Sequence, residues 1–115
     1  MPFHLQDLEA LPGVALIGQK DVPFQYVYID NRTAWQPETG LFVALAGVHN
    51  DGHAFIAGLY KRGMRAFLVS RVPDVSQYPG AGFAVAEKPV QVLQEWAARH
   101  RSQYHYPVIG ITGSN

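Results

Sequence analysis

The sequence predicts an α/β domain in which helices pack on a small mixed sheet, and two observations support this fold class. Short apolar runs typical of buried strands alternate along the chain with segments that have the apolar spacing of helices. Such alternation favours parallel neighbouring strands with helical crossovers between them. The chain has 115 residues, 48% of them hydrophobic and 16% charged, which suffices for one independent core.

The first part of the chain predicts one helix and two strands. Apolar residues at nearly helical spacing cover Phe3–Leu11, and Pro12 with the following glycine ends that pattern. Val14–Ile17 reads as a short strand. Phe24–Ile29 is aromatic and β-branched on both faces, which is typical of a largely buried strand. The segment Trp35–Gly40 contains proline and glycine and is expected to be a loop.

The middle of the chain predicts a strand, a polar loop and a helix in succession. The apolar run Leu41–Leu45 is the expected strand. The helix is expected to start near Asp51, with Asn50 or Asp51 as its N-cap, and to end at Gly63 in a left-handed conformation. Its apolar face is expected to consist of Phe55, Ile56, Leu59 and Tyr60.

Three further strands and one more helix are expected after that unit. The strands are Ala66–Ser70, Phe83–Glu87 and Val108–Thr112. The helix is expected to begin at Pro89, because proline suits a first turn, and to reach about Tyr104. Its expected packed face contains Val90, Leu93, Trp96, Ala97 and His100.

Composition excludes several classes of protein. Nine basic and nine acidic residues give a formal net charge of zero, so neither nucleic acid nor a membrane surface is an expected partner. The absence of cysteine excludes disulfides and thiolate metal sites. The N-terminus lacks the pattern of a signal peptide, and no stretch has the roughly 18 apolar residues of a membrane helix. A cytoplasmic location is therefore expected.

Two polar segments that follow predicted strands are candidates for binding. Asp30, Asn31 and Arg32 follow the strand that ends at Ile29, and they read either as a simple turn or as ligand contacts at a strand end. The loop from Gly47 to His53 opens a helix, where backbone N–H groups are free to meet an anion. Helix capping alone would also account for that loop.

A metal site is not favoured, and a nucleotide loop is only half present. His49 and His53 are four residues apart, but they are not expected to share a helical face, and no third ligand is evident. The last residues, Val108–Asn115, have the form of a strand followed by half of a phosphate-binding loop, without the lysine that such a loop requires. On this motif alone, a plain turn is favoured over a phosphate-binding loop by roughly two to one.

These motifs together resemble the amino-terminal domain of the Mur ligases. The resemblance is carried by Asp30-Asn31-Arg32, by Leu41–Leu45 with Gly47, by Asp51-Gly52-His53 and by Val108–Asn115. The resemblance is greatest to the members that add D-alanyl-D-alanine to UDP-MurNAc-tripeptide in peptidoglycan synthesis. The sequence from His53 to Gly63 also resembles that of the members fused to an alanine racemase. Asn31 departs from the serine usual in the family.

The resemblance implies a binding role without catalytic residues in this chain. The UDP part of UDP-MurNAc-tripeptide would be held by a substrate-binding set consisting of Asn31, Arg32, Gly47, Val48, His49, Asn50 and Asp51. Arg32 has two open roles, ligand contact or bracing of the loop by an ion pair. Thr112, Gly113, Ser114 and Asn115 would be an incomplete ATP loop. The resemblance therefore implies one domain over residues 1–106 and the start of a truncated second domain over 107–115.

The rest of the reaction would lie in parts of the protein beyond this chain. ATP and Mg²⁺ would bind a central domain, a C-terminal domain would bring D-alanyl-D-alanine, and PLP would be needed only if a racemase follows. These two domains are the expected intramolecular partners, and the chain alone is not expected to be active. The competing interpretation is a stand-alone α/β interaction domain with no small-molecule ligand.

Overall fold

The computed structural model describes residues 3–29, 37–44, 52–71 and 73–99. Their centre is a five-stranded sheet in the order β2-β7-β6-β5-β4, in which β4, β5, β6 and β7 are parallel and β2 runs antiparallel to β7. A second, two-stranded sheet pairs β1 with β3. The strands are β1 Phe3–His4, β2 Ala15–Gly18, β3 Pro23–Phe24, β4 Tyr26–Tyr28, β5 Gly40–Val43, β6 Ala66–Val69 and β7 Gly82–Val85.

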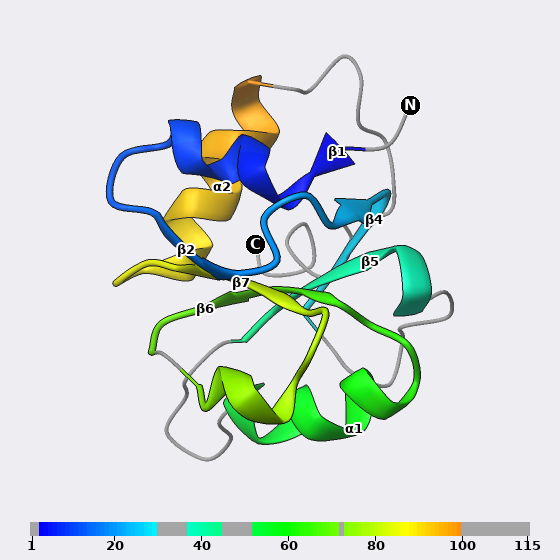
Figure 1. Cartoon of the computed structure of the whole chain (residues 1–115). Coiled ribbons are helices and arrows are strands. Elements are labelled where there is room, and N and C mark those ends of the chain that lie inside the picture. The colour runs from blue at the N-terminus through cyan, green and yellow to red at the C-terminus, as the bar shows by residue number, and fades with distance from the viewer. Residues whose placement is uncertain (1–2, 30–36, 45–51, 72, 100–115) are drawn as a thin grey trace.

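Helices cover both faces of the large sheet (Figure 1). One face is covered by α2 and the 3₁₀ helix η1, and the other by α1 with the short η4 and η5. The α-helices are α1 Ile56–Lys61 and α2 Pro89–Arg99; the 3₁₀ helices are η1 Leu5–Ala10, η3 Pro37–Thr39, η4 Gly52–Phe55 and η5 Val75–Gln77. The prediction of an α/β fold with a small mixed sheet and packed helices is confirmed.

Alternation along the central strands explains why both faces are apolar. In β5, Leu41 and Val43 belong to the core on the α2 side, whereas Phe42 belongs to the core on the α1 side. In β6, Phe67 stacks on Phe83 of β7, with ring centroids 5.2 Å apart. A strand whose two faces are both buried has no polar positions, which is why these strands appear in the sequence as continuous apolar runs.

The α2 face is held together by an aromatic cluster around Trp96. This side chain is 1% exposed, and its ring centroid lies 4.8 Å from that of Phe3 and 5.5 Å from that of Phe24. The helix begins at Pro89 as predicted. The predicted packed face was wrong at Val90, which is 38% exposed, because Val92 packs on the sheet instead.

The α1 face shows how the predicted middle unit is built. The predicted helix is a 3₁₀ turn that continues into α1, and Gly63 follows with φ of 106°, the left-handed conformation expected at a helix end. Ile56 and Leu59 are buried, but Phe55 is 38% exposed, so its assignment to the packed face was wrong. The predicted N-caps, Asn50 and Asp51, lie outside the described residues.

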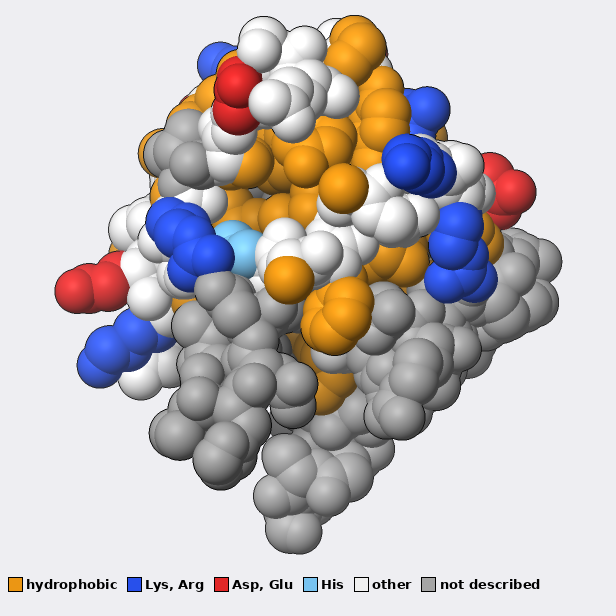
Figure 2. All heavy atoms as spheres, turned by 90° about the horizontal axis from the view of Figure 1, so that it is seen from below, with side chains coloured by type: hydrophobic (Ala, Val, Ile, Leu, Met, Phe, Trp, Pro, Cys, Tyr) orange, Lys and Arg blue, Asp and Glu red, His pale blue; other side chains and the backbone are white. Residues whose placement is uncertain are grey.

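Viewed from the α1 side, the described side chains in the middle of the face are mainly apolar, and charged side chains lie around its margin (Figure 2). No helix in the described part of the chain is long and apolar enough to cross a bilayer.

Two predicted elements near the N-terminus differ from the structure. Residues 3–11 form β1 and the 3₁₀ helix η1 instead of one helix, because the backbone N–H of Leu5 bonds to the carbonyl of Val22, 2.8 Å away, and ties this segment to a distant turn. The predicted strand Phe24–Ile29 is interrupted at Gln25, whose N–H donates to the carbonyl of Thr39 at 2.7 Å. Phe24 therefore pairs with β1, and β4 starts at Tyr26.

The remaining strands agree with prediction to within one or two residues: Val14–Ile17 corresponds to β2, Leu41–Leu45 to β5, Ala66–Ser70 to β6 and Phe83–Glu87 to β7. The predicted loop before β5 contains η3. The helix end near Tyr104 and the strand Val108–Thr112 lie outside the described residues.

Candidate functional site

The carboxyl ends of four parallel strands lie side by side along one edge of the large sheet. Tyr28 of β4 is in register with Phe42 of β5, and Val43 with Leu68 of β6. The pairing continues beyond the strands, since the N–H of Ala44 donates to the carbonyl of Leu68 at 2.8 Å. In open α/β sheets this edge is where ligands bind.

The predicted substrate-binding residues lie outside the described part of the chain. These residues are Asn31, Arg32, Gly47, Val48, His49, Asn50 and Asp51, and the incomplete ATP loop Thr112, Gly113, Ser114 and Asn115 lies outside it as well. The structure does describe the residues that precede the two segments of the substrate-binding set. Residues 30–36 follow Ile29 at the end of β4, and residues 45–51 follow Ala44 at the end of β5. Because β4 and β5 are adjacent and parallel, the last described residues before the two segments, Ile29 and Ala44, lie at neighbouring points of the same edge.

The start of η4 is joined to this edge by a histidine. Nε2 of His53 accepts a hydrogen bond from the backbone N–H of Ser70 at 3.1 Å, and Oγ of Ser70 lies 3.4 Å from the same nitrogen. Ser70 directly follows β6, so the bond fixes the first turn after residue 51 against the neighbouring strand. A neutral imidazole that accepts at Nε2 carries its proton on Nδ1. Sequence reasoning considered His53 as the end of the candidate loop, as part of a family motif and as a metal ligand, and missed this contact.

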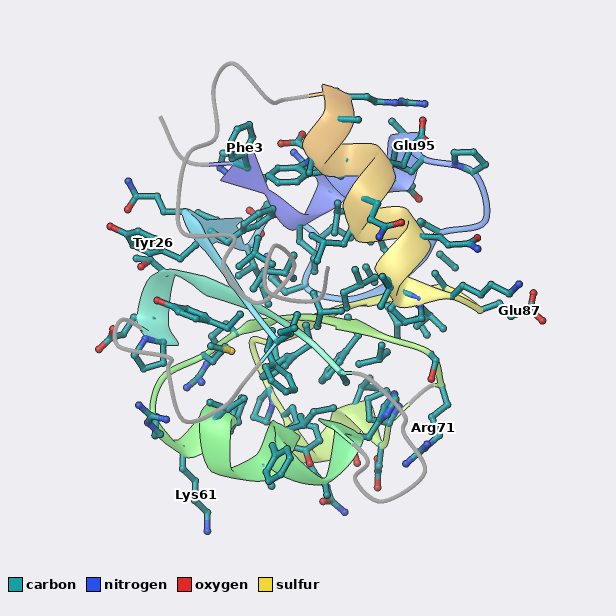
Figure 3. The ribbon with its side chains drawn as sticks, turned by 180° about the vertical axis from the view of Figure 1, so that it is seen from behind. Phe3, Tyr26, Lys61, Arg71, Glu87 and Glu95 are labelled. Carbon is teal, nitrogen blue, oxygen red and sulfur yellow. The ribbon has the colours of Figure 1, made fainter. Side chains whose placement is uncertain are left out.

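Charged side chains follow the next two strands along the edge. Arg71 is exposed and comes directly after Ser70, while Glu87 and Lys88 follow β7. Figure 3 shows Arg71 and Glu87 projecting on one side of the molecule, whereas Tyr26, at the start of β4, lies on the other. The prediction overlooked Arg71, although it follows a buried parallel strand just as Asn31 and Arg32 do.

A cavity of about 390 Å³ lies at the far end of the same edge. It is formed by the turn between η1 and β2, the end of β7 and the first turns of α2, and no sequence pattern indicated it. Its lining residues are Leu11, Pro12, Gly13, Ala86, Glu87, Lys88, Gln91, Val92 and Glu95. Glu95 is also paired with Arg99 at 3.3 Å, so part of the polar lining is engaged within α2.

Within the described ranges, no group of three or more His, Asp or Glu side chains is placed to hold a metal ion. His49 lies outside those ranges, so the pairing with His53 that was considered for a metal stays untested.

Comparison with known proteins gives a consistent family relationship. No family model matches the chain. The UDP-N-acetylmuramoyl-L-alanyl-D-glutamate–2,6-diaminopimelate ligase of Alkaliphilus metalliredigens is 26% identical over 110 residues, and that of Geobacter sulfurreducens is 32% identical over 119 residues. The UDP-N-acetylmuramoyl-tripeptide–D-alanyl-D-alanine ligase of Synechocystis is 32% identical over 95 residues, 83% of this chain.

Solved structures agree in fold. A crystal structure of MurF from Acinetobacter baumannii superimposes with a TM-score of 0.70 over 90% of this chain, at 23% sequence identity. At that identity the match speaks for the fold alone. The chain spans about a fifth of its relatives' length, 22% of both the Alkaliphilus and the Geobacter ligases. The homologues of this chain are thus Mur ligases, and its fold agrees with that of a Mur ligase amino-terminal domain.

Proposed function

We propose that this chain is the substrate-binding part of an ATP-dependent ligase and that it holds the UDP portion of UDP-MurNAc-tripeptide. The observation that carries the proposal is that β4 and β5, which precede residues 30–36 and 45–51 in the sequence, end side by side at one carboxyl edge. The names of the relatives support it, since the substrates named for both kinds of ligase begin with UDP-N-acetylmuramoyl.

The residue chemistry suits a nucleotide. Backbone N–H groups of the segment Gly47–Asp51 are proposed to meet the uracil edge or the diphosphate, as N–H groups in front of a helix commonly do with anions. Asn31 supplies both a donor and an acceptor for a base edge. Arg32 is proposed to contact the ligand or to brace the loop. In this proposal the chain binds and orients the substrate, and the chemistry takes place elsewhere in the protein.

We propose UDP-MurNAc-tripeptide, and not UDP-N-acetylmuramoyl-L-alanyl-D-glutamate, as the substrate because of the motif resemblance. The relatives include ligases that add diaminopimelate as well as one that adds D-alanyl-D-alanine, and the site proposed here meets the part common to their substrates. We assign the D-alanyl-D-alanine reaction because Asp30-Asn31-Arg32, Asp51-Gly52-His53 and Val108–Asn115 resemble that branch. The diaminopimelate-adding reaction is the second candidate, favoured by the Geobacter relative.

In the proposed full-length enzyme, the terminal phosphoryl group of ATP would pass to the tripeptide carboxylate with release of ADP. The dipeptide amine would then displace phosphate from this acyl phosphate and form the amide bond. ATP and Mg²⁺ would supply the activation in a central domain, beginning with the loop at Thr112–Asn115. PLP would be required only by a fused racemase. We propose the cytoplasm as the compartment of the full-length enzyme.

A binding comparison tests the proposal. Calorimetric titration of the 115-residue chain with UDP-MurNAc-tripeptide, UDP and CDP should give binding to the two uridine ligands and much weaker binding to CDP. Equal binding of UDP and CDP, or no binding of either uridine ligand by a folded sample, would refute a uridine site. Assay of the longer protein with D-alanyl-D-alanine and with diaminopimelate then separates the two ligase reactions.

A further inference from the structure

The carboxyl end of β6 carries a polar group of residues that the proposed substrate-binding set does not include. Ser70 and Arg71 follow the strand directly, and His53 of η4 is hydrogen-bonded to Ser70. From this group we infer a contact to the diphosphate of the nucleotide ligand, made by the Ser70 hydroxyl and the Arg71 guanidinium, with His53 as a positioning residue. The inference rests on the proposed function, since it names a further contact in the same site.

The position of β6 suits a diphosphate contact. This strand lies between β5 and β7, and neighbouring strands are about 4.8 Å apart. The end of β6 is therefore about 5 Å from the end of β5 and about 10 Å from that of β4. A nucleotide whose base lies at the ends of β4 and β5 can extend its diphosphate along the edge to Ser70 and Arg71.

The chemistry of the group suits a phosphate more than a neutral ligand. A guanidinium binds phosphate oxygens through two parallel N–H bonds, and a hydroxyl adds a third donor. The backbone N–H of Ser70 donates to Nε2 of His53 at 3.1 Å, and the Ser70 hydroxyl lies 3.4 Å from the same nitrogen. The hydroxyl is the group of this residue that is assigned to the ligand. Holding residue 70 by its backbone also fixes where the next residue, Arg71, leaves the sheet.

Arg71 carries a positive charge at the end of β6, between the ends of β5 and β7. Glu87 and Lys88, which follow β7, carry opposite charges. Figure 3 shows Arg71 and Glu87 on the same side of the molecule. Because Arg71 is exposed, its charge is strongly hydrated, so we expect a contact of moderate strength that weakens with salt.

The test compares ligands with and without phosphate. Wild type and Arg71→Gln are titrated with UDP and with uridine by amide NMR at low and moderate salt. We expect Arg71→Gln to weaken UDP binding about tenfold, the usual loss for one charge-assisted hydrogen bond, to reduce its salt dependence, and to leave uridine binding unchanged. Lys61→Gln is the matched control: it removes one exposed positive charge from the far end of α1 and should alter neither affinity.

The results separate this inference from the proposed function. A wild type that binds neither UDP nor uridine refutes the proposed function. A wild type that binds both, together with an Arg71→Gln variant that binds UDP equally well, overturns the diphosphate contact alone. Equal weakening of UDP and uridine binding would also overturn it, because a phosphate contact cannot affect a ligand without phosphate.

The role of His53 has its own test. His53→Ala should shift the Ser70 amide signal, speed its hydrogen exchange and weaken UDP binding, whereas His53→Gln should restore part of the affinity, because a glutamine oxygen can accept the same N–H. The control is Asp7→Ala. This variant removes a comparable hydrogen bond, which the backbone N–H of His4 donates to Oδ2 of Asp7 at 3.0 Å on the other face of the sheet. If Asp7→Ala weakens UDP binding as much as His53→Ala does, the positioning role is wrong.

Discussion

Substituting Gly82 by alanine should destabilise the fold substantially, because β7 passes very close to another part of the chain at this residue. A Cβ placed on Gly82 would lie 1.9 Å from the carbonyl oxygen of Gln19 and 2.6 Å from Cδ2 of Leu5. The Leu5 side chain can rotate, but the oxygen belongs to the backbone. To make room, residue 19 must move by more than 1 Å, and this motion strains the bond from its N–H to the carbonyl of Ala81, 3.1 Å away.

The magnitude follows from these contacts. Overpacking a dense interior costs about 1–3 kcal/mol, and weakening one backbone hydrogen bond adds about 1 kcal/mol. The lower entropy of alanine in the unfolded chain offsets about 0.5 kcal/mol. The free energy of unfolding should therefore fall by about 2–3 kcal/mol, which corresponds to a Tm lower by roughly 10 °C for a domain of this size.

The assay is thermal and urea unfolding followed by circular dichroism, with Gly58→Ala as the control. Gly58 lies within α1, and a Cβ there meets no atom within 4 Å. The same substitution at Gly58 should stabilise the protein by about 0.5–1 kcal/mol, because alanine is the better helix former. If Gly82→Ala unfolds within about 0.5 kcal/mol of wild type, the close approach of β7 to residue 19 is wrong.

Two further variants test the packing and the charges. Trp96→Ala should lower the free energy of unfolding by about 3–5 kcal/mol, measured by urea unfolding, because it removes a buried indole that contacts Phe3 and Phe24; a loss below about 1 kcal/mol would contradict that packing. Hydrogen bonds from the hydroxyl and the N–H of Ser76 hold the pKa of Asp74 below its ordinary value. The ionised carboxylate therefore stabilises the folded state at pH values above the pKa that Asp74 has in the unfolded chain. This contribution is lost as the pH falls through the pKa of Asp74 in the folded state. A carboxyl NMR titration should give Asp74 a pKa below that of an unfolded peptide, and Asp74→Ala should flatten the acid limb of the stability curve; an ordinary pKa would contradict the bonds to Ser76.

The sequence correctly predicted those strands and helices that can be recognised from the apolar residues of their own segment. The runs that became β5, β6 and β7 have apolar residues on both faces, so their identity as buried strands did not depend on distant contacts. The start of α2 was equally clear, because Pro89 has one preferred place in a helix. The packed face of α2 could not be predicted in the same way. Val90 and Val92 are both apolar, and only the position of the sheet determines which of them is buried.

Features that depend on contacts between distant residues could not be predicted. The break at Gln25 arises from a hydrogen bond to Thr39, fourteen residues further along the chain. The bond between His53 and Ser70 needs the parallel register of β5 and β6, which spacing does not reveal. Arg71 was within reach of sequence reasoning, because the rule that selected Asn31 and Arg32, polar residues directly after a buried parallel strand, applies to it equally.

The central claim is that a uridine nucleotide binds where the carboxyl ends of β4, β5 and β6 meet. The most direct measurement is an amide NMR titration of the chain with UDP-MurNAc-tripeptide. We predict that the largest shifts fall on residues 31–32 and 47–51, on the flanking Ile29 and Ala44, and on Ser70. Shifts confined to the cavity beside the first turns of α2, or no shift in a folded sample, would contradict the account.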